Sequence, residues 1–269
     1  TTLTTWRGKA LNITASAAND HPPKTNHIPL SSPTHMEITV IVAAGSGSRF
    51  GSELPKQFLP LAGKPMLMHT IEAFRKALPS GKIILVLSPG MIPLWEDLCK
   101  THGMQSPQIA EGGASRWESV KHAIEALKDD PASATVLVHD GARPLVSADL
   151  IKRVLAYARN TDGALPAVPV TDSIRKISEN GVTSEAVDRS LYRAVQTPQA
   201  FSLWRLREAY SLPYDEAFTD DASVIAAAGF ENIVLVEGSP ENIKVTTPID
   251  MVIAETILSA NNPKVSCYK

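Results

Sequence analysis

Residues 39–56 read TVIVAAGSGSRFGSELPK, and this stretch decides the fold class. An apolar run rich in β-branched residues (39–42) indicates a short buried strand, and it breaks directly into a glycine-rich turn. Two cations follow the turn, first Arg49 and then, behind Pro55, Lys56. Such a strand exit can hold several phosphates, because main-chain N–H groups and positive side chains both attract anionic oxygens. The stretch therefore indicates nucleotide chemistry.

The spacing of this loop excludes two familiar phosphate-binding motifs. A P-loop ends in Gly-Lys-Ser/Thr, whereas Gly63 and Lys64 are followed by Pro65. A dinucleotide fingerprint has a third glycine three positions after the second, but that position, counted from Gly47, is Phe50. Taken alone, the glycine pair also fits a plain tight turn at a strand exit.

Composition limits the class of protein. A chain of 269 residues with 43% hydrophobic content allows one large α/β domain or two small ones. A formal net charge of -2 gives no bulk electrostatic case for nucleic acid, and no apolar run reaches the length of a membrane span. Cys99 and Cys267 lie far apart without a CxxC pattern, which argues against a disulfide framework or a zinc site. We predict a cytoplasmic protein that binds neither nucleic acid nor membrane.

The two ends of the chain differ from its centre. Residues 1–35 are rich in Thr, Ser, Asn and Pro and show no apolar periodicity, so we expect a disordered N-terminal extension. Met36 stands directly before the first strand, which favours an overlong start; the alternative is a transit segment, which would imply a plastid location. We expect a single domain over 36–260 and a C-terminal tail over 261–269.

Strand-like and helix-like segments alternate through this domain. Strands are expected at 38–43, 82–87, 107–110, 135–139, 163–168 and 232–236, and helices at 65–77, 91–101, 115–128, 147–159, 202–210, 220–228 and 248–259. This alternation predicts an α/β fold with a mostly parallel twisted sheet and helices on both faces. Ligands of such sheets bind beyond the carboxyl ends of the strands.

Residues 172–190 break the alternation. Asn180-Gly181 lies between two short alternating runs, which is typical of a β-hairpin. We expect this hairpin to project as an arm from the body of the domain. Because an isolated hairpin is marginally stable in water, the arm should pack on a second copy of the chain and form a homodimer. The alternative is a hairpin that folds back on its own domain.

Several polar groups stand where strands end or helices begin. The glycine turn 112–115 leads into a helix with Ser119, and it fits either a base or phosphate contact or a plain helix cap. Asp140 ends an aliphatic strand, and Arg143 follows three residues later. These two residues either contact a ligand or form a local ion pair with each other. Thr219 begins a segment that resembles a helix cap.

The remaining polar residues carry weaker signals. Asp188-Arg189 alone fits a solvated pair, and Lys244 lies between apolar neighbours in the sequence. The segment 197–199 reads as a neutral turn. No histidine has the HxxxH or HxH spacing of a metal site; those considered are His69, His102, His122 and His139.

Together these segments resemble one family, the 2-C-methyl-D-erythritol 4-phosphate cytidylyltransferases. The motifs appear in that family's order: AAGSGSRF, LPKQFLPLAGKP, EGGASRWESV, VHDGARPLV, AVPVTDSIRK, VDRSLYRAVQTPQAF, FTDDAS and EGSPENIKVTTPIDM. The resemblance covers residues from about 36 to 259. It implies a Rossmann-like nucleotidyltransferase fold and a reaction of CTP with methylerythritol 4-phosphate, with Mg²⁺ on the triphosphate, in non-mevalonate isoprenoid biosynthesis.

The resemblance also implies roles for matching residues. Arg49 and Lys56 would stabilise the transition state, and Arg189 and Lys244 would position the incoming phosphate. The implied nucleotide contacts are Ala43, Ala44, Gly45, Gly47, Gly112, Gly113 and Ser119. The implied polyol contacts are Asp140, Arg143, Ser173 and Thr219. The family's arm clasps its twin, so Arg189 would serve the neighbouring subunit; no side chain is assigned to the metal.

Three alternatives stay open at this point. A cytidylyltransferase for another polyol phosphate, such as ribitol 5-phosphate, fits PKQFLPL and NIKVTTP equally well, whereas VHDGARP and TDSIRK favour methylerythritol phosphate. A non-catalytic nucleotide-binding module on the same fold is a second alternative, although such modules usually lose the charged residues that are present here. A dehydrogenase is disfavoured by the fingerprint mismatch.

Overall fold

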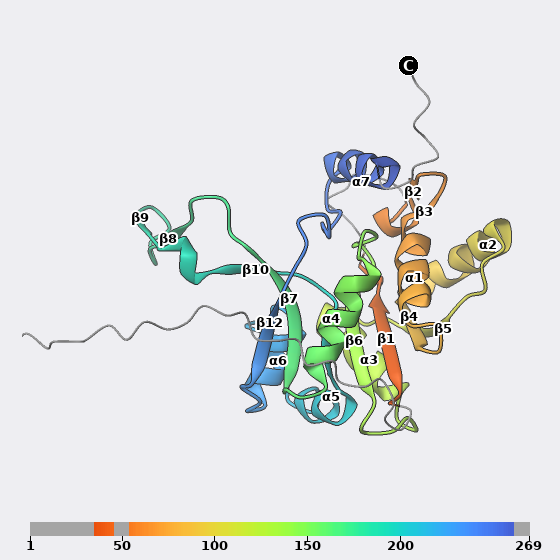
Figure 1. The fold of residues 1–269 in the computed structure, drawn as a ribbon, viewed down its shortest axis with the longest axis horizontal. Helices are drawn as coiled ribbons and strands as arrows, with labels where there is room; N and C mark the ends of the chain where they lie inside the picture. The colour runs from red at the N-terminus through yellow and green to blue at the C-terminus, as the bar shows by residue number, and fades with distance from the viewer. Residues whose placement is uncertain (1–34, 46–53, 261–269) are drawn as a thin grey trace, which may run out of the picture. The chain divides into compact units, whose positions relative to one another are not determined.

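A mixed, eight-stranded sheet organises the computed structural model, which describes residues 35–45 and 54–260 (Figure 1). The strand order is β10-β7-β11-β6-β1-β4-β5, and β12 pairs with β7. The bounds are β1 Glu37–Val42, β4 Lys82–Leu87, β5 Gln108–Glu111, β6 Thr135–Asp140, β7 Gly163–Pro169, β10 Arg193–Val195, β11 Gln199–Ser202 and β12 Ile233–Glu237. The six expected strands are confirmed with bounds that shift by one residue at most.

Four neighbouring strands, β6, β1, β4 and β5, run parallel. Val42 at the end of β1 is in register with Asp140 of β6 and Val86 of β4, and Leu87 is in register with Glu111 of β5. The carboxyl ends of these strands therefore finish at the same sheet edge. This register brings the loops that follow β1, β5 and β6 together in space.

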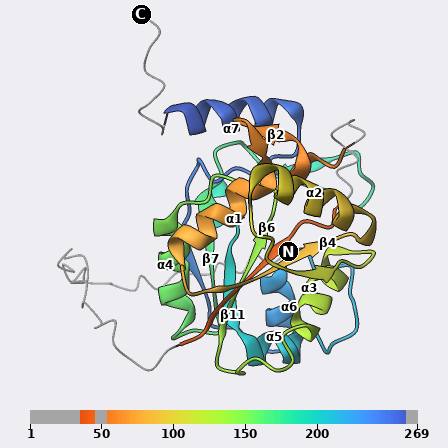
Figure 2. The same ribbon diagram turned by 90° about the vertical axis from the view of Figure 1, so that its right-hand side faces the viewer.

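Helices cover both faces of the sheet, as expected (Figure 2). One face packs against α1 (Met66–Ala77), α2 (Ile92–His102) and α4 (Ala148–Ala158), and the other against α3 (Arg116–Glu125), α5 (Leu203–Ala209) and α6 (Asp221–Ala227). Strand side chains alternate between the two cores: in β1, Ile41 packs in the first and Val40 in the second. All six of these helices were expected from the sequence.

The last helix, α7 (Pro248–Ala260), covers a small satellite core. That core also contains Leu61 of β2 (Pro60–Leu61), which pairs antiparallel with β3 (Lys64–Pro65). The described residues also form three 3-10 turns, η2 (Lys56–Phe58), η3 (Pro89–Met91) and η4 (Arg189–Leu191). No helix within residues 35–45 and 54–260 is long and apolar enough to cross a membrane.

The strands β10 and β11 were not expected, and they make the sheet mixed. Both pair antiparallel with β7, and β11 also pairs antiparallel with β6. Gln199, assigned to a neutral turn from the sequence, begins β11, while Ala200 and Phe201 are fully buried. The local pattern does not indicate a strand, because these runs are short and flank Pro198; the pairing partners on either side stabilise them.

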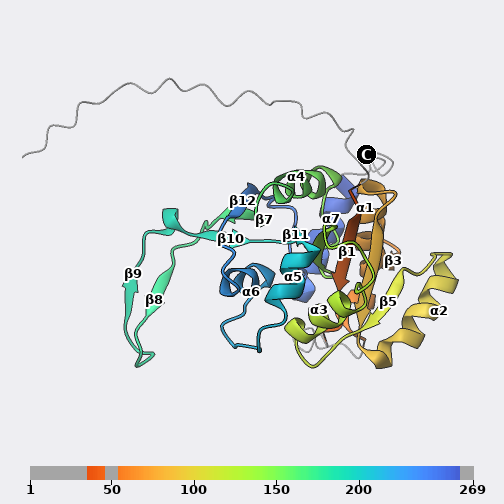
Figure 3. The same cartoon turned by 90° about the horizontal axis from the view of Figure 1, so that it is seen from below.

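The expected hairpin is present as a two-stranded sheet of its own, β8 (Arg175–Ile177) with β9 (Ser184–Ala186). Gly181 adopts a φ of 70°, which explains the glycine in the turn. Every residue of both strands is exposed, and the hairpin extends away from the main sheet (Figure 3). The projecting arm of the sequence prediction is thus confirmed.

Gly163, at the start of β7, packs directly against a buried ring. A Cβ at this position would lie 2.4 Å from Cε1 of Phe201, whose side chain has no exposed surface. We expect Gly163→Ala to lower the free energy of unfolding by about 1–3 kcal/mol, because the ring has little room to move. Denaturant unfolding measures the change. Gly90→Ala, where an added Cβ meets no described atom within 4 Å, is the control. An unchanged unfolding midpoint for Gly163→Ala would contradict this packing.

Candidate active site

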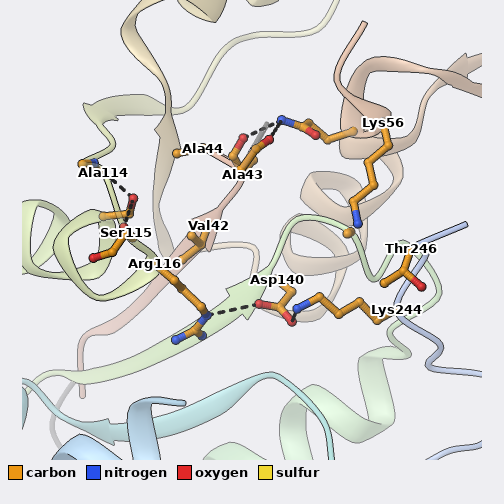
Figure 4. Close-up of a pocket in the computed structure, with 15 residues that line it drawn as sticks. Val42, Ala43, Ala44, Lys56, Ala114, Ser115, Arg116, Asp140, Lys244 and Thr246 are labelled. Carbon is orange, nitrogen blue, oxygen red and sulfur yellow. Dashed lines mark hydrogen bonds and ion pairs between the residues drawn. The ribbon is translucent and has the colours of Figure 1, made fainter. Parts of the chain in front are cut away.

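The loops that follow β1, β5 and β6 meet around one cavity of about 530 Å³, called here the larger cavity (Figure 4). Its lining is Val42, Ala43, Ala44, Gly45, Lys56, Gln57, Gly113, Ala114, Ser115, Arg116, Ser119, Asp140, Ala142, Lys244 and Thr246. Figure 4 shows the side chains of Lys56 and Lys244 pointing toward the same space. Segments far apart in the sequence therefore share one cavity at the carboxyl edge of the sheet.

The exit of β1 is held by the side chain of Gln57. Its Nε2 donates to the carbonyl oxygens of Ala43 at 2.7 Å and Gly45 at 3.1 Å, and the residue is 4% exposed. These bonds tie the 3-10 turn η2 to the strand exit. Because Lys56 precedes Gln57, the same bonds place the lysine backbone beside the start of the glycine-rich loop.

The turn after β5 packs closely against the exit of β1. A Cβ on Gly112 would lie 2.3 Å from Cβ of Ala44 and 3.1 Å from Oγ of Ser119, so this position requires glycine. Ser119 Oγ accepts the N–H of Gly113 at 3.1 Å and donates to the carbonyl oxygen of Ser115 at 2.8 Å. Ser115 is also the N-cap of α3. The turn is thus both a helix cap and part of the cavity wall.

Asp140, at the end of β6, faces three cations. Its carboxylate lies 2.9 Å from Nζ of Lys244, 3.5 Å from Nε of Arg116 and 3.6 Å from Nε of Arg143. Burial alone would raise the pKa of Asp140, but the positive charges of Arg116, Lys244 and Arg143 outweigh burial and hold that pKa well below its usual range. Asp140 is therefore ionised whenever the fold is intact near neutral pH.

A second cavity of about 290 Å³, the smaller cavity, shares Arg116, Asp140 and Lys244 with the larger one. Its other lining residues are Arg143, Val195, Gln196, Thr197, Gln199, Thr219 and Asp220. Two ligands, one in each cavity, could therefore contact the same group of charged side chains. The positive charge of that group suits anionic ligands.

Buried polar groups support Asp140 from behind. Thr197 Oγ1 accepts the N–H of Asp140 at 3.1 Å and lies 3.0 Å from Nδ1 of His139. A carbonyl oxygen can only accept a hydrogen bond, so the neutral His139 ring has its proton on Nε2 and donates it to the carbonyl oxygen of Arg143 at 3.1 Å. Nδ1 is then unprotonated and accepts the hydroxyl proton of Thr197. Burial lowers the pKa of His139 to about 4, so the ring is neutral at pH 7.

The segment that carries Lys244 is tied to the same support. Arg143 donates to the carbonyl oxygen of Asn242 at 2.7 Å, and Nδ2 of Asn242 donates to the carbonyl oxygen of Thr197 at 2.9 Å. Asn242 has no exposed surface. These bonds link the loop after β6, the segment before β11 and the segment before α7, which explains how Lys244 reaches Asp140.

Most site residues inferred from the sequence lie at the two cavities. Those that line the larger cavity are Ala43, Ala44, Gly45, Lys56, Gly113, Ser119, Asp140 and Lys244, and those added by the smaller one are Arg143 and Thr219. Gly112 lies against Ala44, behind the wall. Arg189 and Ser173 are exposed at the base of the arm and line neither cavity of the single chain. Arg49 and Gly47 lie outside the described residues.

Sequence reasoning did not assign Arg116 and Gln57 to this site, and it also left out other lining residues such as Thr197 and Thr246. Arg116 carried a usable signal, because a cation directly after a glycine turn at a strand exit is the same pattern that singled out Arg49. Gln57 carried no comparable signal, since a buried glutamine that bonds two carbonyl groups has no distinctive sequence pattern.

The parallel-rich sheet with a cationic cavity at the carboxyl ends of its strands defines an α/β fold of the nucleotidyltransferase class. Comparison with known proteins agrees. A model of the 2-C-methyl-D-erythritol 4-phosphate cytidylyltransferase family matches residues 37–260. The chain belongs to this family, and it is an enzyme of the nucleotidyltransferase type.

Individual relatives are similar over nearly their whole length. The chain is 46% identical to the 2-C-methyl-D-erythritol 4-phosphate cytidylyltransferase of Phocaeicola vulgatus over 81% of this chain and 98% of that protein. It is 42% identical to that of Bacillus thuringiensis over 83% and 98% of the two chains. The crystal structure of the enzyme so named from Thermus thermophilus superposes with a TM-score of 0.63 at 34% identity, covering 82% of this chain and 98% of that one.

The buried His139 couples stability to pH. Its pKa is about 4 in the fold against an ordinary value of 6.5, so the unfolded chain takes up a proton first as the pH falls. The stability contributed by neutral His139 is thus present above about pH 6.5 and lost progressively toward pH 4, by roughly 3 kcal/mol in all. Unfolding of the wild type and of His139→Asn between pH 4 and 7 measures this. The variant should lose less stability on acidification.

The exposed His102 offers a matched control for that measurement. His102→Asn should keep the wild-type dependence of stability on pH. Parallel curves for the wild type and His139→Asn would show that the buried ring does not carry the effect.

Proposed function

We propose that this chain transfers the cytidylyl group of CTP to 2-C-methyl-D-erythritol 4-phosphate and releases pyrophosphate, a step in isoprenoid precursor biosynthesis. The observation that carries the proposal is the pair of cavities that share Arg116, Asp140 and Lys244. Such an arrangement can hold a nucleotide on one side and a phosphorylated polyol on the other. The identity of the two substrates rests on the membership of the family.

The reaction is an in-line displacement at phosphorus. A phosphate oxygen of the polyol phosphate attacks the α-phosphorus of CTP, a new P–O bond forms, and the bond to the β-phosphate breaks to release pyrophosphate. No general base is required, because the attacking phosphate is already an anion. The barrier lies in bringing two anions together and in spreading charge over a five-coordinate phosphorus, so catalysis is positioning plus cationic stabilisation.

The larger cavity is the proposed nucleotide site. The exit of β1 (43–45) would wrap the triphosphate with main-chain N–H groups, and the turn at Gly112 and Gly113 with Ser119 would contact the cytosine. Lys56, which lines this cavity, would stabilise the charge that develops at the α-phosphate. Arg49 and Gly47, outside the described residues, keep the roles inferred from the resemblance.

The smaller cavity is the proposed polyol phosphate site. The carboxylate of Asp140 can accept hydrogen bonds from polyol hydroxyl groups, and Thr219 and Arg143 line the same cavity. Lys244 lines both cavities, so it is placed to hold the incoming phosphate at their boundary. The attack would then take place between Lys56 and Lys244.

A magnesium ion would bind to the triphosphate of CTP and not to side chains of this site. Mg²⁺ prefers oxygen ligands and is commonly bound by phosphates, water and one or two carboxylates. Among the described residues, Asp140 is the one carboxylate that lines the larger cavity, and its oxygens already face Lys244 and Arg116. Phosphate oxygens of CTP would therefore hold the metal, which would neutralise part of the triphosphate charge.

The arm supports a homodimer. Ile177, Val182 and Leu191 are 67%, 85% and 80% exposed, and burying this apolar surface on a second copy would stabilise the arm. Arg189 and Ser173 lie at the base of this arm, away from both cavities of their own chain. We therefore propose that each arm contributes Arg189 and Ser173 to the polyol phosphate site of the partner.

Pyrophosphate release from CTP in the presence of Mg²⁺ tests the proposed function. Turnover should require 2-C-methyl-D-erythritol 4-phosphate, and it should be slower with ribitol 5-phosphate. Faster turnover with ribitol 5-phosphate would assign the chain to another polyol phosphate. Tight binding of CTP without turnover would instead support a non-catalytic nucleotide-binding module.

Removal of the Lys56 charge should impair the chemical step. We expect Lys56→Ala to lower kcat by about 10²-fold or more, in line with the loss of one preorganised charge at the reacting phosphate. Steady-state kinetics with both substrates at saturation measures the change. Lys100→Ala, which removes a solvent-exposed lysine of α2, should leave kcat unchanged. A near-wild-type kcat for Lys56→Ala would exclude it from transition-state stabilisation.

Sharing of sites between subunits can be tested by mixing two impaired variants. Arg189→Ala should mainly raise the KM for the polyol phosphate, because it removes a positioning charge. If Arg189 acts in the partner's site, a refolded equal mixture of Arg189→Ala and Lys56→Ala should recover about one quarter of the wild-type activity, since heterodimers contain one intact site; the assay uses a polyol phosphate concentration far below the raised KM, so that Arg189→Ala alone is nearly inactive. Activity equal to the mean of the two separate variants would show that Arg189 does not act across the interface.

A further inference from the structure

Arg116 lines both cavities, yet the proposed mechanism gives it neither transition-state stabilisation, which falls to Lys56, nor phosphate positioning, which falls to Lys244. Its Nε lies 3.5 Å from Oδ1 of Asp140. The two terminal nitrogens of its guanidinium donate to Asp221, from Nη1 to Oδ1 at 3.0 Å and from Nη2 to Oδ2 at 2.7 Å. This is the paired geometry in which a planar guanidinium binds a carboxylate most specifically.

Asp221 is buried and fully engaged. Its residue has no exposed surface, and Oδ1 also accepts the hydroxyl of Tyr210 at 2.6 Å. Burial, together with the charge of Asp221, raises the pKa of Tyr210, so the phenol stays protonated and donates. The ring of Tyr210 stacks on Trp117 with centroids 5.7 Å apart. Asp221 therefore has little freedom to move.

The backbone around Asp221 is anchored as well. Asp220 caps α6 through a capping box with Ser223, as the sequence suggested for this segment. Gln199 of β11 donates from Nε2 to Oδ2 of Asp220 at 2.9 Å and accepts the N–H of Ala222 at 3.0 Å. The first turn of α6 is thus tied to the sheet. The carboxylate of Asp221 lies in this first turn, where its negative charge stabilises the helix N-terminus, and it also binds Arg116.

We propose that Asp221 and Tyr210 are positioning residues that hold Arg116 between the two cavities and thereby fix Asp140 and Lys244. With both terminal nitrogens bound to Asp221, Arg116 presents only Nε to Asp140. A released guanidinium would instead turn its paired nitrogens to Asp140 and compete with Lys244, whose Nζ lies 2.9 Å from Oδ2. Asp221 therefore keeps the positive charge of Arg116 at both cavities and leaves Asp140 available to Lys244 and to a ligand hydroxyl.

This proposal rests on the proposed function, and Asp221→Asn tests it through the kinetics. The amide keeps the shape of the carboxylate but removes its charge and one acceptor. We expect the KM for the polyol phosphate to rise by about tenfold and the KM for CTP by less than about threefold, because Asp140 and Lys244 are the groups that move. Arg116→Lys keeps the charge but loses the paired geometry, so it should act in the same direction.

A double-mutant cycle separates positioning from a merely structural role. If Asp221 acts through Arg116, Asp221→Asn should change the KM for the polyol phosphate by less than about twofold in the Arg116→Lys background. Additive effects, or a lowered melting temperature with an unchanged KM, would overturn the proposal. Asp149→Asn, which breaks the exposed Asp149–Arg153 pair of α4, is the matched control and should leave both KM values unchanged.

Tyr210→Phe provides a second variant should Asp221→Asn fail to fold. It removes one hydrogen bond to Asp221 and retains the ring that stacks on Trp117. The KM for the polyol phosphate should rise by about threefold. A KM equal to that of the wild type would overturn the assignment of Tyr210.

A crystal structure of Asp221→Asn gives a readout that does not depend on the reaction. We expect the guanidinium of Arg116 to turn toward Asp140 and the contact between Asp140 and Lys244 to lengthen. An unchanged Arg116 would overturn the proposal. A wild-type chain that does not turn over CTP with methylerythritol phosphate would overturn the proposed function, while this structure would still decide the positioning role.

Discussion

The attraction between one buried carboxylate, Asp140, and the cations around it organises the whole site. A buried ion without partners costs several kcal/mol, so Asp140 can be placed at the end of β6 only because Arg116, Arg143 and Lys244 approach it from three different segments. Among the described residues, the two cavities are lined by four cations, Lys56, Arg116, Arg143 and Lys244, and by two carboxylates, Asp140 and Asp220; with the buried Asp221 counted as well, the positive charges still exceed the negative ones by one. The excess makes the shared wall of the two cavities attractive to phosphates. Both cavities are therefore suited to anionic ligands.

The parallel register of β6, β1, β4 and β5 is what makes this convergence possible. Because Val42 and Asp140 are in register on neighbouring strands, the glycine-rich loop and the loop of Arg143 leave the sheet side by side. The neutral His139 and the hydroxyl of Thr197 then hold Asp140 from behind without adding charge. The same neutral ring would link the proposed site to stability, since we expect the group that supports Asp140 to make the fold sensitive to acid as well.

Much of the fold could be predicted from the sequence because its signals are local. The apolar periodicities of β1, β4 and β6 and the Asn180-Gly181 turn belong to single segments, and the structure follows them. The strands β10 and β11 could not be predicted in the same way, because their stability comes from β6 and β7, which are distant in the sequence. Lys56, Asp140 and Lys244 were found from strand ends and motif resemblance. The partnership of Arg116 with Asp221 spans 105 positions and has no local signature.

A crystal structure of the chain with CTP, Mg²⁺ and 2-C-methyl-D-erythritol 4-phosphate, obtained with a variant slow enough to retain both substrates, is the most direct test of this account. The triphosphate should lie along the exit of β1 beside Lys56, the cytosine next to Gly113 and Ser119, and the polyol phosphate in the smaller cavity against Lys244. Binding of either substrate away from the wall formed by Arg116, Asp140 and Lys244 would contradict the account.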